Sequence, residues 1–366
     1  MIDTVEQFDY NSLNDDYNSA YHSWRKTGPS SFCFRYQKKK EEKMSADLGS
    51  KLPPNEKDTE RNVMRNAIHI LGIALILMLL AESLGSRLFV WIFNSAGIPT
   101  QTDFLTYSTY GSQWSVILVK ILSETLKYLV PALFLSFQLK YPKKMFTSLK
   151  CHSWQEQFGT VGLGLAVGVL IYFAENLSNT YILDIRNIYN LKGNQALICY
   201  AVYELVLGSV LAEWLLRGIL LPLLRQYSDL FAVLLTAFIG LLCPNNLPYR
   251  LGEFLLGIAC GFIFLRCGSL LYAYMIRFSY SLFLIGKMIS DANERSFSDS
   301  AFLLTVSIIS CIFILIWIIF RKKKYHIKNN SHFLKAYEQL EMILFTPSML
   351  AWIGISLILA VIQLCL

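Results

Sequence analysis

Residues 301–320 have the sequence AFLLTVSIISCIFILIWIIF, which contains no charged side chain. A helix needs about 20 predominantly apolar residues to cross the hydrocarbon core of a bilayer, so this stretch predicts a transmembrane helix. Eight other apolar stretches predict further helices of the same kind. In chain order, the nine predicted helices cover residues 67–93, 113–137, 159–181, 196–221, 230–243, 251–266, 269–289, 301–320 and 343–366.

The composition of the whole chain agrees with this pattern. Of its 366 residues, 54% are hydrophobic and 16% are charged, and the mean hydropathy is +0.42. A soluble domain carries about 25% charged residues, so the composition excludes an ordinary soluble enzyme. We therefore predict an all-α fold, a polytopic transmembrane helix bundle with about eight to nine spans. We expect the short helices at 230–243 and 251–266 to be tilted, broken or joined by a re-entrant turn around residues 244–248.

Basic residues are unevenly distributed among the predicted loops. They precede the first helix and recur in residues 140–150 and 321–335, whereas residues 94–112 contain none. With nine spans, the three basic segments lie on one side of the membrane, and the positive-inside rule places that side in the cytoplasm. The sequence thus predicts a multi-pass protein of the cell membrane with a cytoplasmic N-terminus. The net charge of +7 reflects these loops, and we expect no nucleic-acid partner.

The chain divides into four parts by composition. They are a polar and disordered cytoplasmic segment (1–66), N-terminal transmembrane helices (67–195), a core (196–290) and C-terminal transmembrane helices (291–366). For residues 1–43, two interpretations stay open. Either translation begins at Met44, or the segment is a tail whose scattered aromatic residues dock a partner.

Several ionisable side chains interrupt the predicted helices. A charge inside a membrane is costly, so each such residue needs a partner and is a candidate for a functional site. Glu213 and Arg217 are four residues apart, with the acid nearer the N-terminus, which is the favourable order for an ion pair on a helix. We predict that Arg277, in the middle of another helix, joins them in a buried cluster. The acids that could pair with it are Glu175, Glu204, Glu213 and Glu253.

Glycines recur at helical spacing in two of the helices, at Gly164 and Gly168 and at Gly257 and Gly261. This pattern lets helix backbones approach closely in lipid, and we interpret it as packing within one chain rather than dimerisation. The eight cysteines include no C-x-x-C pair, so we predict neither a zinc site nor a disulfide framework.

Four stretches carry a resemblance to a known family. They are Ala212-Glu-Trp-Leu-Leu-Arg-Gly218, Ala237-Phe-Ile-Gly-Leu-Leu-Cys243, Phe254-Leu-Leu-Gly-Ile-Ala-Cys-Gly261, and Arg266-Cys-Gly-Ser leading to Arg277-Phe-Ser-Tyr-Ser281. In this order they resemble the motifs of the CPBP family, which are E-E-x-x-x-R-G, F-x-x-x-H, a glycine-containing apolar helix and H-x-x-x-N. This family contains the CAAX prenyl endopeptidases and bacteriocin-processing membrane proteases. The resemblance implies the fold of an intramembrane metalloprotease for residues 196–290.

The resemblance retains the scaffold of the family but not its chemistry. The second glutamate and the arginine of the first motif are present as Glu213 and Arg217. Four family positions carry other residues here. Ala212 replaces the general base, Cys243 and Arg277 replace the two histidines, and Ser281 replaces the asparagine. All five histidines of the chain lie outside this region. As the resemblance implies, hydrolysis needs a base and neutral imidazoles that bind a metal or stabilise an oxyanion. An arginine stays protonated and repels a divalent cation.

We therefore expect a catalytically inactive relative that acts as a binding or regulatory scaffold in the membrane. We expect no cofactor and no metal, and the expected partners are membrane lipid and another membrane protein or a peptide. The alternative is an active intramembrane metalloendopeptidase, of the CAAX or bacteriocin-processing type, that uses Glu213 in a divergent site. A further alternative is a transporter component whose buried charges line a path.

Overall fold

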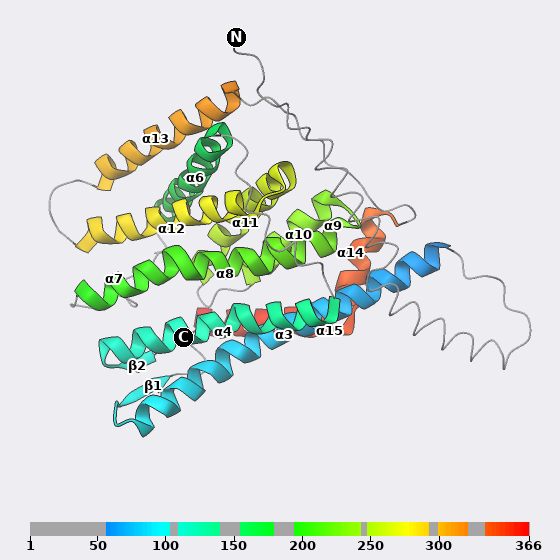
Figure 1. Cartoon of the computed structure of the whole chain (residues 1–366), viewed down its shortest axis with the longest axis horizontal. Coiled ribbons are helices and arrows are strands. Elements are labelled where there is room, and N and C mark those ends of the chain that lie inside the picture. The colour runs from blue at the N-terminus through cyan, green and yellow to red at the C-terminus, as the bar shows by residue number, and fades with distance from the viewer. Residues whose placement is uncertain are drawn as a thin grey trace, which may run out of the picture.

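The computed structural model describes residues 56–102, 109–139, 154–178, 194–242, 247–292, 299–320 and 334–365. These residues form a bundle of helices that lie side by side, with one small β-hairpin (Figure 1). The elements are α3 (Glu56–Ser95), β1 (Thr100–Thr102), β2 (Thr109–Gly111), α4 (Gln113–Leu139), α6 (Trp154–Ser178), α7 (Asn194–Tyr203), η2 (Glu204–Gly208), α8 (Ser209–Glu213), η3 (Trp214–Leu220), α9 (Leu221–Arg225), α10 (Asp229–Leu242), α11 (Leu247–Cys267), α12 (Leu270–Ala292), α13 (Asp299–Phe320), α14 (Ala336–Phe345) and α15 (Pro347–Cys365). The predicted all-α fold is confirmed.

Each of the nine predicted helices has a counterpart among these elements. The ninth is divided into α14 and α15, which meet at a bend of 72°. Helix α3 begins at Glu56, inside the segment that we predicted to be disordered. The reason is that residues 56–66 contain several good helix formers and that Met64 is fully buried. Residues 1–55, with Met44, lie outside the described residues, as does most of the predicted re-entrant turn.

The order of the helices in space differs from their order in the sequence. Helix α4 packs along α3 on one side and against α7, α8 and η3 on the other. Helix α12 contacts η2 and α8, and α6 packs against both α12 and α13. Helices α10 and α11 form a pair, and α15 lies against α3. The continuous helix from α7 to α9, here called the central helix, therefore has neighbours on both sides (Figure 1).

The hydrophobic core follows these contacts. Its largest cluster of buried side chains joins α3, the central helix, α10 and α15. Trp352 of α15 and Ile219 of η3 have no exposed surface in this cluster. A second cluster joins α6, α11 and α12, so the core lies on both sides of the central helix.

Glycines set the closest approaches between helices. Gly164 and Gly168 of α6 face α12, and a Cβ atom at either position would overlap atoms of α12. Gly257 of α11 faces α10, where a Cβ atom would lie 2.7 Å from the Cα of Ala237. Gly261, one turn later, also faces α10. Both glycine pairs therefore serve packing within the chain, as predicted.

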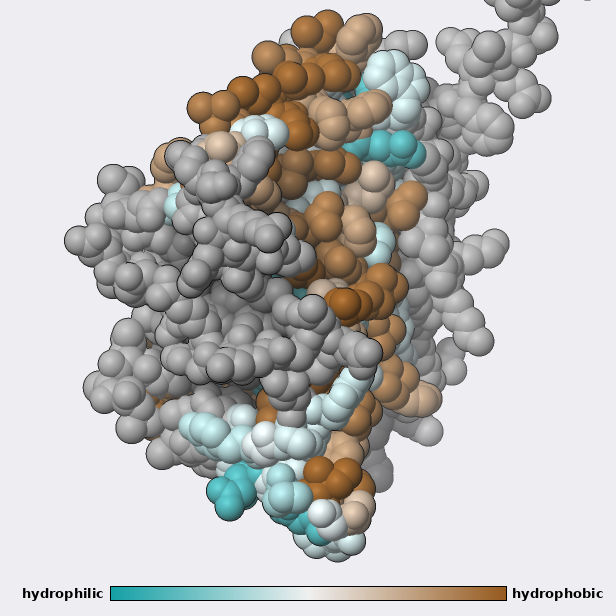
Figure 2. Space-filling model, turned by 90° about the vertical axis from the view of Figure 1, so that its left-hand side faces the viewer, coloured by the Kyte–Doolittle hydropathy of each residue, from teal (hydrophilic) through white to brown (hydrophobic). Residues whose placement is uncertain are grey.

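Apolar side chains also cover much of the outside of the bundle. Figure 2 shows them along one face, with hydrophilic side chains gathered at its lower end, where the hairpin lies in Figure 1. On α13 the exposed apolar side chains include Leu304, Ile308, Ile312, Leu315 and Ile319. An apolar surface of this extent fits a lipid environment, which agrees with a membrane protein.

The number of spans stays a prediction. Among the described residues, four helices are long and apolar enough to cross a membrane, or five if α14 and α15 form one bent span. Helix α10 is short, with 14 residues, and α4 carries Lys120, Glu124 and Lys127. Length and composition therefore do not establish nine spans, and the side on which the N-terminus lies also stays a prediction.

Candidate functional site

The central helix is irregular where it carries its charges. Two of its segments, η2 and η3, are π-helical, and both lie within one helix of 32 residues from α7 to α9. A π-helical turn contains an extra residue, which changes the face that the following side chains occupy, and such turns are frequent at functional sites. Glu204 begins η2, Glu213 ends α8, and Arg217 lies in η3. The irregular turns thus contain or border all three charges.

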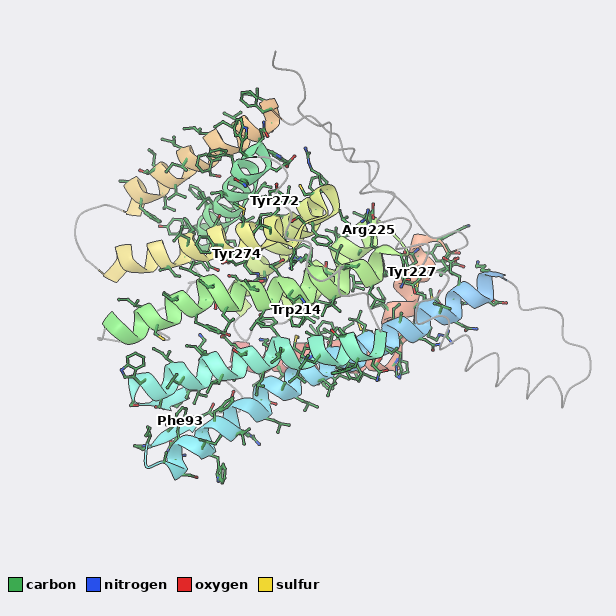
Figure 3. All side chains as sticks on the ribbon, in the orientation of Figure 1. Phe93, Trp214, Arg225, Tyr227, Tyr272 and Tyr274 are labelled. Carbon is green, nitrogen blue, oxygen red and sulfur yellow. The ribbon has the colours of Figure 1, made fainter. Side chains whose placement is uncertain are left out.

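Glu213 is the centre of the site. Its Oε1 atom accepts one hydrogen bond from Nε of Arg277, at 2.7 Å, and another from Nη1 of Arg217, at 3.1 Å. The side chains of Glu213 and Arg217 have no exposed surface. The adjacent Trp214 lies between the central helix and α4 (Figure 3), whereas Glu213 faces α12. The predicted buried cluster of Glu213, Arg217 and Arg277 is confirmed.

A second carboxylate completes the site from α11. Glu253 accepts two hydrogen bonds from the guanidinium group of Arg277, with Nη1 at 3.1 Å from Oε1 and Nη2 at 2.6 Å from Oε2. Such a bidentate pair is among the strongest hydrogen-bonded contacts in proteins. We call Glu213, Arg217, Glu253 and Arg277 the Glu–Arg cluster. With two charges of each sign, this cluster is neutral and holds the central helix, α11 and α12 together.

The backbone of α11 takes part in the same network. Nη2 of Arg217 donates to the carbonyl oxygen of Gly257, at 2.8 Å. A Cβ atom on Gly257 would lie 3.2 Å from that nitrogen, so the missing side chain makes room for the guanidinium group. Glu253 and Gly257 are one helical turn apart, which explains why both face the arginines.

Two atoms in the centre of the cluster have no hydrogen-bond partner among the described residues. They are Oε2 of Glu213 and Nε of Arg217, and both are buried. A buried charged group with an unused acceptor or donor costs free energy. The cluster therefore retains one acceptor and one donor for a small polar group.

The other predicted site residues lie near the cluster but do not enter its hydrogen bonds. Ala212 is buried in α8, next to Glu213. Ser281 is buried in α12, one turn beyond Arg277, and within the described part of the chain no hydrogen bond joins it to the cluster. Cys243 and the side chain of Glu175 lie outside the described residues.

Glu253 and Gly257 belong to the site but lie outside the motif positions that we predicted to form it. The sequence contained a signal for each. Glu253 was one of four acids that could pair with Arg277, and Gly257 belonged to a glycine pattern that we interpreted only as packing. What the sequence could not show is which of the four acids reaches Arg277, because that depends on the rotation of α11 about its axis.

The residues of the site do not fit a metal ion. Oε1 of Glu213 already accepts from two guanidinium groups. Both groups stay protonated and repel a divalent cation. Among the described residues, no group of three or more His, Cys, Asp or Glu side chains is placed to hold a metal. We therefore propose no metal-dependent reaction for this site.

Comparison with protein families identifies this part of the chain. Residues 194–283 match the family model described as type II CAAX prenyl endopeptidase Rce1-like. This part of the chain is therefore similar to the Rce1-like endopeptidases. The match covers about a quarter of the chain and confirms the resemblance that the four motif stretches carry. Comparisons with curated proteins and with solved structures gave no match.

The Rce1-like region contains the whole Glu–Arg cluster. It begins with α7 and ends within α12, so the central helix, α10 and α11 all lie inside it. Together with the apolar helices, this match shows a CAAX-protease-like membrane protein.

Proposed function

We propose that this protein is a catalytically inactive relative of the CAAX proteases that binds a membrane-associated peptide or another membrane protein without cleaving it. The observation that carries the proposal is the double contact on one oxygen of Glu213. Arg277 stands where the resemblance places a family histidine, and its Nε atom lies 2.7 Å from Oε1 of Glu213. The retained glutamate is therefore engaged by arginine.

This geometry opposes hydrolysis at two points. A general base must accept a proton from water, but Oε1 of Glu213 already accepts from Arg217 and Arg277, and its Oε2 is buried. The residue beside it is Ala212, so no second carboxylate is present at the position of the family's general base. The site thus lacks a free base in the place where the family has one.

The same geometry supports binding. The Glu–Arg cluster is neutral, and its outer members, Glu253 and Arg277, retain some exposed surface. Apolar helices surround it, so a ligand that approaches from the membrane meets lipid-compatible side chains first. The proposal includes a location in the cell membrane with the N-terminus in the cytoplasm, which the basic loops support.

A peptidase assay tests this proposal. The full-length protein, reconstituted in lipid nanodiscs, is mixed with a fluorescent prenylated peptide that ends in a CAAX sequence. We expect fluorescence anisotropy to show binding, and we expect mass spectrometry to show no cleaved product. The Glu213→Gln variant should likewise give no cleaved product.

Two results would contradict the proposal. Cleavage that is lost in Glu213→Gln but kept in Glu341→Gln, an exposed carboxylate of α14, would show an active peptidase. Absence of both binding and cleavage would show that the site does not take this class of peptide.

A further inference from the structure

A second set of charged side chains lies beside the Glu–Arg cluster. Nζ of Lys127 in α4 is 2.9 Å from Oε2 of Glu82 in α3, and this pair is almost fully buried. One to two turns earlier in α4, Nζ of Lys120 is 4.0 Å from Oε1 of Glu124, and these two side chains are 29% and 21% exposed. Neither pair belongs to the site described above.

Glu204 connects this second set to the Glu–Arg cluster. It lies in η2 of the central helix, which packs against α12, while α4 packs against the adjoining segments α7 and α8. The charged groups within electrostatic reach of Glu204 are Lys120, Lys127 and Glu124 from α4, Arg277 from α12 and Glu253 from α11. Glu82 of α3 faces Glu124 in turn. Electrostatic interactions with Glu204 thus link the two sets into one network in the interior of the bundle.

Among the described side chains, the charges of this network do not balance. It contains the five carboxylates of Glu82, Glu124, Glu204, Glu213 and Glu253 and the four cations of Lys120, Lys127, Arg217 and Arg277. Each of the other four carboxylates has an ion pair with a cation, as Glu82–Lys127, Glu124–Lys120, Glu213–Arg217 and Glu253–Arg277, and Arg277 also contacts Glu213. Within the described part of the chain, Glu204 is the carboxylate that remains without an ion pair.

The surroundings of Glu204 make an unpaired negative charge costly. Exposed apolar side chains flank it on the same helix, so its outer side borders lipid rather than water. These exposed apolar side chains are Val202, Val206, Leu207 and Val210. On the inner side, the carboxylate lies over Gly208, where a Cβ atom would be 3.2 Å from Oε2. An ionised carboxylate in such a place loses its hydration without gaining a counter-ion.

We propose that Glu204 is a proton-binding site, and that it carries the one proton that makes the charged interior of the bundle neutral. A proton is the ligand that the charge count requires, because it adds one positive charge and needs no further ligand atoms. This inference does not depend on whether the Glu–Arg cluster binds or cleaves peptides.

Infrared spectroscopy tests the proposal on the full-length protein in lipid nanodiscs at pH 7. A protonated carboxylic acid has a carbonyl band that is separate from the bands of carboxylates and amides. We expect one such band in the unmodified protein, its loss in Glu204→Gln, and its retention in Glu341→Gln.

Thermal unfolding provides a second measurement that does not rely on the band. Glutamine is a neutral isostere of protonated glutamate, so Glu204→Gln should leave the melting temperature at pH 7 unchanged. The matched variant Glu82→Gln removes an ionised partner from Lys127 and should lower the melting temperature.

Three outcomes would overturn the proposal. One is the absence of a protonated carboxyl band, and another is a band that persists in Glu204→Gln. The third is a melting temperature that depends on sodium at constant ionic strength and loses this dependence in Glu204→Gln, which would show that a metal cation neutralises the site.

Discussion

Replacement of Arg277 by alanine is expected to lower the free energy of unfolding by about 3–5 kcal/mol, the usual cost of removing one partner of a buried ion pair. Arg277 donates to Glu213 and to both oxygens of Glu253. Among the described side chains, its loss leaves Glu253 without an ion pair and Glu213 with Arg217 alone. Both carboxylates are then poorly compensated in the middle of an apolar bundle.

Chemical unfolding in detergent micelles measures this effect. The control is Arg65→Ala, which removes an exposed arginine from α3 and is expected to change the free energy of unfolding by less than about 0.5 kcal/mol. A loss for Arg277→Ala no larger than that of the control would show that Arg277 does not hold the helices together.

Gly257→Ala is expected to lower the free energy of unfolding by about 1–3 kcal/mol, the typical cost of forcing an extra methyl group into a packed interior. The new Cβ atom would lie 2.7 Å from the Cα of Ala237, a backbone atom that cannot move aside freely. It would also press on Nη2 of Arg217, which donates to the carbonyl oxygen of Gly257. Helices α10 and α11 must separate or the arginine must shift.

The chain supplies a matched control for this substitution. Gly354 lies in α15, and outside its own helix backbone no atom of the described residues is within 4 Å of the position of a Cβ atom. Because alanine favours a helix over glycine by about 0.8–1.0 kcal/mol, Gly354→Ala is expected to leave the protein as stable or slightly more stable. Equal effects at both positions would contradict the close contact between α10 and α11.

The positions of the helices could be predicted because apolar stretches of sufficient length are rare outside membrane helices. The charged cluster could be predicted for the complementary reason, since Arg277 in an apolar helix requires a buried acid. The π-helical turns η2 and η3 could not be predicted, because no residue type marks them. The sequence shows that Glu204 is a charged residue within an apolar helix. Only the ion pairs of the neighbouring carboxylates show that Glu204 has no ion pair in the described part of the chain.

The resemblance of the motifs was a guide to the site but not to its contacts. It placed Glu213, Arg217 and Arg277 in one region, and the structure joins them. It did not indicate Glu253, which is outside the motif positions that we compared. The number of spans is also not fixed by the pattern, because α4 carries charges and α10 is short.

The central claim is that Arg277 engages the retained Glu213, and a double-mutant cycle tests it most directly. The free energies of unfolding are measured for Glu213→Gln, Arg277→Met and the double variant. We predict a coupling energy of about 1.5–3 kcal/mol, the range for a hydrogen bond to a charged group. The pair Glu213→Gln and Arg65→Met should be additive within about 0.5 kcal/mol. Additivity of the first pair within the same limit would contradict the account.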